Sequence, residues 1–300
     1  MDTDARVPDA RAVWRAFGRA ASTYDAAAVL QREIGARLAS RLDVVKLDPA
    51  AILDAGCGTG EAVGGLSARY PRARIVAVDA APAMVAAARE RAARSRPLAA
   101  RLLGRFAPPG AAFACADVAA LPLRAGSVDL VWSNLVFQWV GDLPRAFAEC
   151  RRVLKVGGLF TFTTFGPDTL KELREAFARV DAQPHVNRFV DLHDLGDLLV
   201  DAGFADPVVD MEMLTVTYAT PQALLGDLKA IGATNQAPGR RRGLTGRGRH
   251  RALVEALSAF ARDGRIPATF EVVYGHAWKA EPTRTAEGLP IVRLERGRKA

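Results

Sequence analysis

The stretch ILDAGCGTG, from Ile52 to Gly60, decides the fold of this chain. Its apolar part ends in Asp54 and predicts a buried strand, and Gly56, Gly58 and Gly60 predict a tight turn into a helix. Glycine suits this turn because the backbone must take angles that other residues avoid and must come close to a ligand. A glycine-rich strand-turn-helix without a functional role is the alternative interpretation.

A second apolar run, IVAVDAA from Ile75 to Ala81, ends the next predicted strand with Asp79. A carboxylate at this position can accept hydrogen bonds from both hydroxyls of a ribose. A dinucleotide fingerprint would have the spacing G-x-G-x-x-G, because a pyrophosphate must lie at the helix N-terminus. The spacing here is G-x-G-x-G, with Asp54 two positions before the first glycine, and it suits a cofactor without phosphates.

This pattern resembles the first motif of the class I S-adenosylmethionine-dependent methyltransferases. The resemblance implies that S-adenosyl-L-methionine is the cofactor, that Asp54 faces its amino group and that the glycine backbone faces its carboxylate. It also implies a Rossmann-like, doubly wound α/β sheet with the cofactor at the carboxyl ends of parallel strands. Ala80, next to Asp79, belongs to the same predicted site.

Composition limits the classes of protein and partner. Half of the 300 residues are hydrophobic, which suits one large domain or one domain with a substantial insertion. The net charge of +8 and the pI near 9.8 favour polyanionic partners, either nucleic acid or an acidic protein, and do not choose between them. A high-GC genome would also enrich a chain in Arg and Ala.

The sequence predicts a cytoplasmic protein. No run is long and apolar enough to span a membrane, and the N-terminus has acidic residues in place of an apolar signal core. Cys57, Cys115 and Cys150 are scattered, so we expect reduced thiols. The four histidines are also dispersed, and no metal site is predicted.

Strands and helices alternate along most of the chain. Strands are predicted at 52–54, 75–79, 113–116, 128–133, 159–164, 207–218 and 269–278. Helices are predicted at 82–94, 143–153, 168–180 and 192–202, with one or two more at 13–42. The alternation predicts a doubly wound sheet with right-handed crossovers, and we expect the last two strands to be adjacent and antiparallel.

The expected organisation has five parts. They are an N-terminal helical lid at 1–45, the cofactor-binding methyltransferase core at 46–220, a helical, Arg-rich insertion on the substrate side at 221–268, the final strand at 269–280 and a disordered tail at 281–300. An insertion at 95–112, rich in Ala, Pro and Arg, has no assigned role.

Two further strand ends extend the predicted cofactor site. Asp117 can accept a hydrogen bond from the exocyclic amino group of adenine, with the backbone of Val118 framing the ring. In the alternative, Asp117 only caps the following helix. Asn134 ends the next strand, and Phe137 and Trp139 follow it as cavity walls or as core. The Asn/Asp-Pro-Pro-aromatic motif of base methylation is absent from this segment.

Longer segments resemble the malonyl-acyl-carrier-protein O-methyltransferases of biotin biosynthesis. These segments are FGRAASTYDAAAVLQ (17–31), SNLVFQWVGDLPRAFAECRRVLKVGG (133–158), FTTFGPDTLKELREAF (162–177), HVNRF (185–189) and LKAIGATNQAPGRRRGLTGR (228–247). The match spans about residues 14 to 279, and the last two segments are far more specific than the glycine turn. One departure is Lys155-Val156 in place of the usual Lys-Pro before two glycines.

The resemblance implies transfer of a methyl group from S-adenosylmethionine to the free carboxylate of a malonyl thioester on an acidic acyl-carrier protein. The methyl ester masks the charge, so that the chain can be elongated toward pimelate for biotin. A sulfonium methyl is already activated and the carboxylate is already ionised, so no general base is needed. The enzyme must orient the reactants and exclude water.

Four residues are the candidates for handling the substrate. Arg188, Arg240 and Arg247 are cations that could recruit the carboxylate, provided that no tight bidentate clamp draws charge from the attacking oxygen. Tyr24 is expected in the lid, with its hydroxyl near the cofactor carboxylate or the methyl group. A helix-face aromatic packed on the sheet is the alternative for Tyr24.

Other interpretations stay open at this point. The arginines from 240 to 251 could form a solvated loop, dock an acidic carrier protein or bind nucleic acid, and the lack of interleaved aromatics ranks nucleic acid last. A neighbouring family, respiratory complex I assembly factors that hydroxylate an arginine, shares the DLP-R-A, DTL-EL and DLG-LL-AGF patterns. A non-catalytic cofactor-binding regulator and an enzyme for another small carboxylic acid are further alternatives. The oligomeric state is open.

Overall fold

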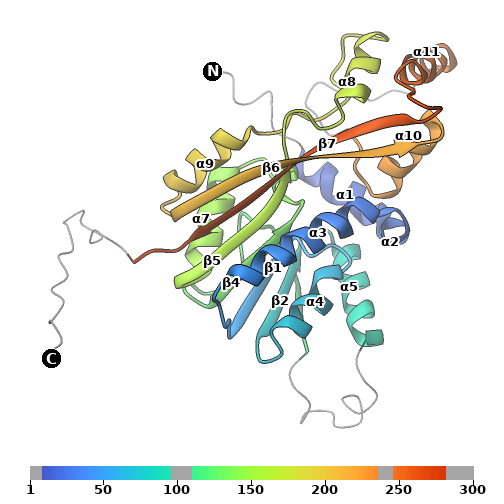
Figure 1. The fold of residues 1–300 in the computed structure, drawn as a ribbon. Helices are drawn as coiled ribbons and strands as arrows, with labels where there is room; N and C mark the ends of the chain where they lie inside the picture. The colour runs from blue at the N-terminus through green and yellow to red at the C-terminus, as the bar shows by residue number, and fades with distance from the viewer. Residues whose placement is uncertain (1–8, 96–109, 236–245, 282–300) are drawn as a thin grey trace, which may run out of the picture.

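The strands of the protein form one mixed sheet in the order β3-β2-β1-β4-β5-β7-β6 (Figure 1). The structure is a computed structural model that describes residues 9–95, 110–235 and 246–281. The strands are β1 (Ala51–Ala55), β2 (Arg74–Asp79), β3 (Ala112–Cys115), β4 (Val128–Asn134), β5 (Leu154–Phe165), β6 (Ala205–Tyr218) and β7 (Ile266–Trp278). Pairing is parallel from β3 to β5, and β7 is antiparallel to both of its neighbours. The predicted doubly wound sheet with an antiparallel end is confirmed.

Helices cover both faces of the sheet. They are α1 (Ala10–Ala20), α2 (Tyr24–Ala27), α3 (Val29–Arg41), α4 (Glu61–Arg69), α5 (Pro82–Ser95), α7 (Leu143–Val153), α8 (Lys171–Ala178), α9 (Leu192–Asp201), α10 (Pro221–Ala230) and α11 (Arg247–Ser258), with short 3-10 turns η2 (Leu42–Val44) and η4 (Phe137–Trp139). Side-chain caps begin several of them; the Asp142 carboxylate, for example, accepts a hydrogen bond from the Arg145 N–H at 3.0 Å at the start of α7. None of the helices in the described ranges is long and apolar enough to cross a membrane.

Alternate residues of the central strands point to opposite faces of the sheet and contribute to two separate hydrophobic cores. Ile52 of β1 packs with α3 and α4 on one face, and Leu53 packs with α7 and α9 on the other. Burial on both faces explains why these strands are continuous apolar runs in the sequence. On the α7 side the core is aromatic, with Phe137 against Phe160 and Phe162 at centroid distances of 5.6 and 5.4 Å.

The β6–β7 pair extends beyond the rest of the sheet. β5 pairs only with residues 272–278 of β7, whereas β6 pairs with β7 from Ile266 onward. The final strand therefore begins at Ile266 and not at 269, because a tertiary pairing with β6 supports the extra residues. Figure 1 shows this two-stranded extension reaching toward α10 and α11.

Two other element boundaries differ from the predicted ones. β5 begins at Leu154, and the expected turn at Gly157, where φ is 75°, lies within an irregular part of the strand. α8 begins at Lys171 and not at 168, because the preceding backbone bonds to β7: the N–H groups of Gly166 and Leu170 donate to the carbonyls of Glu271 and Thr269. The predicted tail from 282 onward and most of the insertion at 95–112 lie outside the described residues.

A substitution at Gly275 of β7 tests the packing between β7 and β5. A Cβ atom at Gly275 would lie 2.4 Å from the Phe162 ring, so we expect Gly275→Ala to lower the free energy of unfolding by about 1–3 kcal/mol in urea denaturation. Gly64 is a matched control, since it lies exposed inside α4 with no atom within 4 Å of an added Cβ. Gly64→Ala should raise stability by about 0.5–1 kcal/mol. Equal effects of the two substitutions would contradict this account.

Candidate functional site

The glycine turn after β1 has the strained backbone that the sequence predicts. The φ angles of Gly56, Gly58 and Gly60 are 79°, 52° and 79°. At Gly56 a Cβ atom would lie 2.2 Å from the Val136 side chain, so no other residue fits there. The N–H groups of Gly56 and the next residue both donate to the carbonyl of Val78 at 2.8 Å, which joins the turn to β2.

Asp79 lies at the end of β2, beside this turn. Its carboxylate accepts hydrogen bonds from the N–H of Gly58 at 2.9 Å and from the N–H of Ala81 at 2.8 Å. Burial raises the pKa of Asp79, although these two hydrogen bonds act to lower it. Asp79 also lines a cavity of about 100 Å³, here called the strand-end cavity, together with Ala80, Asp117 and Val118. The structure thus brings together the predicted residues of three strand ends.

Asp117 precedes a turn and not the helix that the alternative interpretation required. Its carboxylate accepts a hydrogen bond from the Ala119 N–H at 2.9 Å, which holds this turn, and its side chain also lines the strand-end cavity. Val118 is buried beside it. One carboxylate oxygen can hold the local turn while the other faces a ligand, because a carboxylate accepts several hydrogen bonds.

Asp54 is a strongly perturbed acid of the site. Its side chain is 2% exposed, and Oδ2 has no hydrogen-bond partner among the described residues. Burial and the nearby Asp79 raise the pKa of Asp54 to about 7. Gln31 Oε1 and Trp132 Nε1 are likewise buried without a partner, and all three residues line a cavity of about 360 Å³ between α3, α4 and the turn, here called the turn cavity.

These unpartnered atoms test whether the expected cofactor fits. A buried polar atom without a partner is costly, so a ligand that supplies the missing donors and acceptor is favoured. A ligand ammonium group can donate hydrogen bonds to the two acceptors, Asp54 Oδ2 and Gln31 Oε1. An acceptor on the ligand can in turn accept a hydrogen bond from the Trp132 N–H. The amino acid end of S-adenosylmethionine has both kinds of group, so the residues present fit this cofactor.

Asn134 connects the lid to the sheet at the same place. Its Oδ1 accepts a hydrogen bond from the Thr163 hydroxyl at 2.7 Å, and its Nδ2 donates to the Gln31 carbonyl of α3 at 3.0 Å. The side chain lines both the turn cavity and the strand-end cavity. Asn134 therefore lies between the two cavities, much of its hydrogen-bonding capacity is used within the protein, and its contact with the cofactor stays a prediction.

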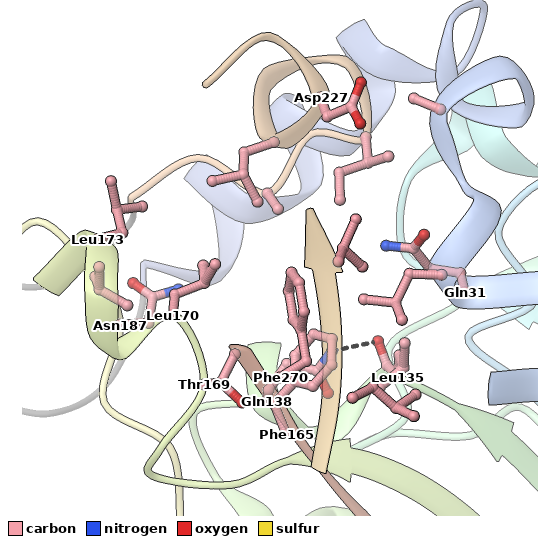
Figure 2. Close-up of a pocket in the computed structure, with 18 of the residues that line it drawn as sticks. Gln31, Leu135, Gln138, Phe165, Thr169, Leu170, Leu173, Asn187, Asp227 and Phe270 are labelled. Atoms are coloured by element: carbon pink, nitrogen blue, oxygen red, sulfur yellow. Dashed lines mark hydrogen bonds between the residues drawn. The ribbon is translucent and has the colours of Figure 1, made fainter. Parts of the chain in front are cut away.

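A third cavity, of about 400 Å³ and here called the large cavity, opens beside these two (Figure 2). Its lining is mostly apolar and comes from the N-terminal helices, the segment after β4, the region of α8, the β6–β7 extension and α10. In Figure 2, Leu170, Leu173 and Asn187 lie on one side of the strand of the extension and Gln31 and Leu135 on the other. A cavity of this size with a mostly apolar lining suits an organic acyl group.

Tyr24 lines all three cavities and so marks their junction. The Phe17 ring lies 6.5 Å from the Tyr24 ring and 5.2 Å from that of Trp139, so these aromatics form one wall. Burial, Asp79 and Asp25 all raise the pKa of Tyr24, which keeps the phenol neutral. Of the two aromatics after β4, Phe137 is core and Trp139 lines the large cavity.

The two predicted arginines in the described part of the chain, Arg188 and Arg247, do not line these cavities. Arg188 is exposed, although its neighbours Asn187 and Phe189 both line the large cavity. Arg247 is exposed at the first position of α11. Arg240 lies outside the described residues. Recruitment of a carboxylate by these cations stays a prediction.

Some contacts of the site were not predicted from the sequence. Gln31, Thr59 and Asp25 contribute to the turn cavity, and Asp25 and Thr59 are hydrogen-bonded to each other at 2.6 Å. In the sequence, their only signal is their position: Asp25 and Gln31 lie within the segment 17–31, and Thr59 lies within the glycine motif 52–60.

The raised pKa of Asp54 predicts pH-dependent binding of the cofactor. Above a pH of about 7 the ionised carboxylate attracts the ligand ammonium, and below it the protonated acid does not. We expect the affinity for S-adenosylhomocysteine to fall as the pH decreases from about 7.5 to 5.5, by up to tenfold per pH unit, in calorimetric titrations. Asp54→Asn should bind more weakly and without this dependence. A dependence that persists in Asp54→Asn would assign it to another group.

Comparisons with known proteins agree with this geometry. Residues 53–162 match a family model described as a methyltransferase domain. The chain is 50% identical over 289 residues to a malonyl-[acyl-carrier protein] O-methyltransferase from Gallionella capsiferriformans, covering 96% of this chain and 97% of that protein. It is 51% identical over 284 residues to one from Methylovorus sp., covering 94% and 93%. The solved YcgJ protein from Bacillus subtilis shares the fold, with a TM-score of 0.57 at 17% identity over 82% of this chain and 98% of that chain.

Proposed function

The chain belongs to the malonyl-[acyl-carrier protein] O-methyltransferase family, and we propose that it methylates the free carboxylate of a malonyl thioester on an acyl-carrier protein. The product is the methyl ester that primes pimelate synthesis for biotin. The observation that supports this function best is the meeting of three cavities at Tyr24, two of them lined by the residues predicted to hold the cofactor and the third large enough for an acyl group. Relatives at about 50% identity favour this activity over arginine hydroxylation. A cytoplasmic location is part of the same proposal.

S-Adenosyl-L-methionine is the cofactor, and it supplies an already activated methyl group. We assign its ribose to Asp79, its adenine to Asp117 and Val118, and its amino group to Asp54, following the cavities that these residues line. The backbone of the glycine turn and Asn134 hold the remaining amino acid end. With the cofactor held by these residues, Tyr24 would lie beside it, because Tyr24 lines both of the cavities that they form.

The acceptor carboxylate needs no base, because it is ionised at neutral pH. The protein instead excludes water and fixes the line of approach, and the apolar lining of the large cavity serves both purposes. Since its pKa is raised, the Tyr24 hydroxyl acts as a hydrogen-bond donor to one carboxylate oxygen and leaves the other free to attack. Tyr24 is thus the residue that we propose to orient the substrate.

The carrier protein is expected to dock through exposed arginines. On α1, Arg11, Arg15 and Arg19 recur on one exposed face, and none of them forms an ion pair with another described residue. α11 adds Arg247 and its neighbours, also exposed. Both helices lie close to the large cavity, since α1 contributes Phe17 to its lining and α11 packs on α8 and α10. Clustered positive charge attracts an acidic partner and speeds its association.

Mass spectrometry of malonyl-carrier protein tests the proposed reaction. Incubation with the protein and S-adenosylmethionine should add one methyl group to the malonyl form and none to the acetyl form, because only the former has a free carboxylate. Malonyl-coenzyme A run in parallel distinguishes the two thioesters. Binding of the cofactor without any methylation of these acceptors would overturn the proposal.

The docking surface makes a separate prediction. Arg247→Ala and Arg15→Ala should raise the KM for malonyl-carrier protein several-fold, increasingly so at low salt, and leave the KM for the cofactor nearly unchanged. Arg72 is the control: it precedes the amino end of β2, whereas the cofactor residues follow the carboxyl ends of the strands, and it pairs with Asp48 at 3.2 Å in an exposed position. Equal effects on both KM values would indicate a structural role for the substituted arginines.

A further inference from the structure

A network of side chains ties the short helix α2 to the glycine turn. Asp25 Oδ1 accepts a hydrogen bond from the Thr59 hydroxyl at 2.6 Å, and Oδ2 accepts one from Arg91 of α5, also at 2.6 Å. Arg91 in turn pairs with Glu61 at the start of α4. Three segments that are distant in sequence, namely α2, the glycine turn and α5, thus meet at the Asp25 carboxylate.

The helix that carries Asp25 has little else to fix it. α2 consists of four residues, none of them fully buried, and it has no side-chain cap at Thr23. A helix this short is not stable by itself. Besides the Asp25 carboxylate, the segment is held by the Arg32 guanidinium, which donates to the Asp25 carbonyl at 2.6 Å, and by the Thr23 hydroxyl, which donates to the Ala230 carbonyl at 2.9 Å.

The two ends of the Asp25–Thr59 contact are both next to the reaction site. Asp25 directly follows Tyr24, which marks the junction of the three cavities. Thr59 is 3% exposed and lies between two turn glycines, of which Gly58 also bonds to Asp79. The contact therefore joins the residue at the junction to the turn that holds the cofactor.

We propose that Asp25 is a positioning residue that fixes Tyr24 over the cofactor through its bonds to Thr59 and Arg91. The proposal rests on the proposed role of Tyr24 in orienting the malonyl carboxylate. Asp25 lines the turn cavity, but both of its carboxylate oxygens are bonded within the protein, to Thr59 and to Arg91. Its proposed role is to set the place of the Tyr24 hydroxyl, and a displacement of about 1 Å at such a group reduces turnover on the order of a hundredfold.

The charges around Asp25 are consistent with this role. Arg91, Arg32 and Glu61 are the charged groups in contact with it or with its partner. Burial acts to raise the pKa of Asp25, but the hydrogen bonds from Thr59 and Arg91 lower it, so the carboxylate is ionised at neutral pH. Because Asp25 and Arg91 are partly exposed, their pair contributes little to global stability. Its effect on catalysis is therefore separable from its effect on folding.

Asp25→Ala and a matched control, Asp43→Asn, test the proposal. Asp43 also pairs an N-terminal residue with an arginine, Arg69 of α4, at 2.7 Å and with similar exposure, but it is distant in sequence from Tyr24. We expect Asp25→Ala to lower kcat about a hundredfold with a smaller change in the cofactor KM and a nearly constant Tm, and Asp43→Asn to leave kcat unchanged. Thr59→Val should behave like Asp25→Ala, and Thr59→Ser, which retains the hydroxyl, like the wild type.

A double-mutant cycle with Tyr24→Phe decides whether Asp25 acts through Tyr24. If it does, the double variant loses no more activity than the more impaired single variant; multiplying losses would overturn the proposal. Hydrogen exchange separates this from failure of the proposed function. The Ala28 amide, which donates to the Tyr24 carbonyl at 2.8 Å, should exchange at least about tenfold faster in Asp25→Ala than in Asp43→Asn with S-adenosylhomocysteine bound, whatever the acceptor is. Equal exchange in the two variants would also overturn the proposal.

Discussion

The glycine turn is the constraint on which the rest of the site depends. With no room for a Cβ atom at Gly56, the backbone runs directly against Val136 after β4 and bonds to Val78 of β2. The ends of three strands are thereby locked to one another. Two carboxylates, Asp54 and Asp79, consequently lie close together in a buried place, which is costly unless a ligand with donors and positive charge compensates them.

Much of this could be predicted from the sequence, because the information was local. Continuous apolar runs that end in acidic residues identified the central strands, and positive-φ glycines follow from the motif itself. The start of β7 at Ile266 could not be predicted, since it depends on pairing with β6 across an intervening helical segment. The Asp25–Thr59 contact was missed for a similar reason, as its partners are 34 positions apart and neither residue type is distinctive.

The positions of individual arginine side chains could not be predicted from the net charge of the sequence. The net charge of +8 predicts attraction of an anion, but not whether a given arginine enters a cavity or stays on the surface. In the described part of the chain Arg188 and Arg247 are exposed, whereas polar neighbours such as Asn187 line the large cavity. Long-range attraction of the carrier and local orientation of its carboxylate are thus assigned to different residues.

The β6–β7 extension also shows that the cofactor site and the large cavity are formed by different parts of the chain. The residues predicted to hold the cofactor lie before position 140, whereas most residues that line the large cavity, including those of the extension, come after position 160. Because the extension is anchored in the sheet at only one end, its free end can change in length or composition without disturbing the glycine turn. Acceptor preference in such a protein can therefore diverge by mutation of its C-terminal half alone, while the chemistry of methyl donation is inherited intact.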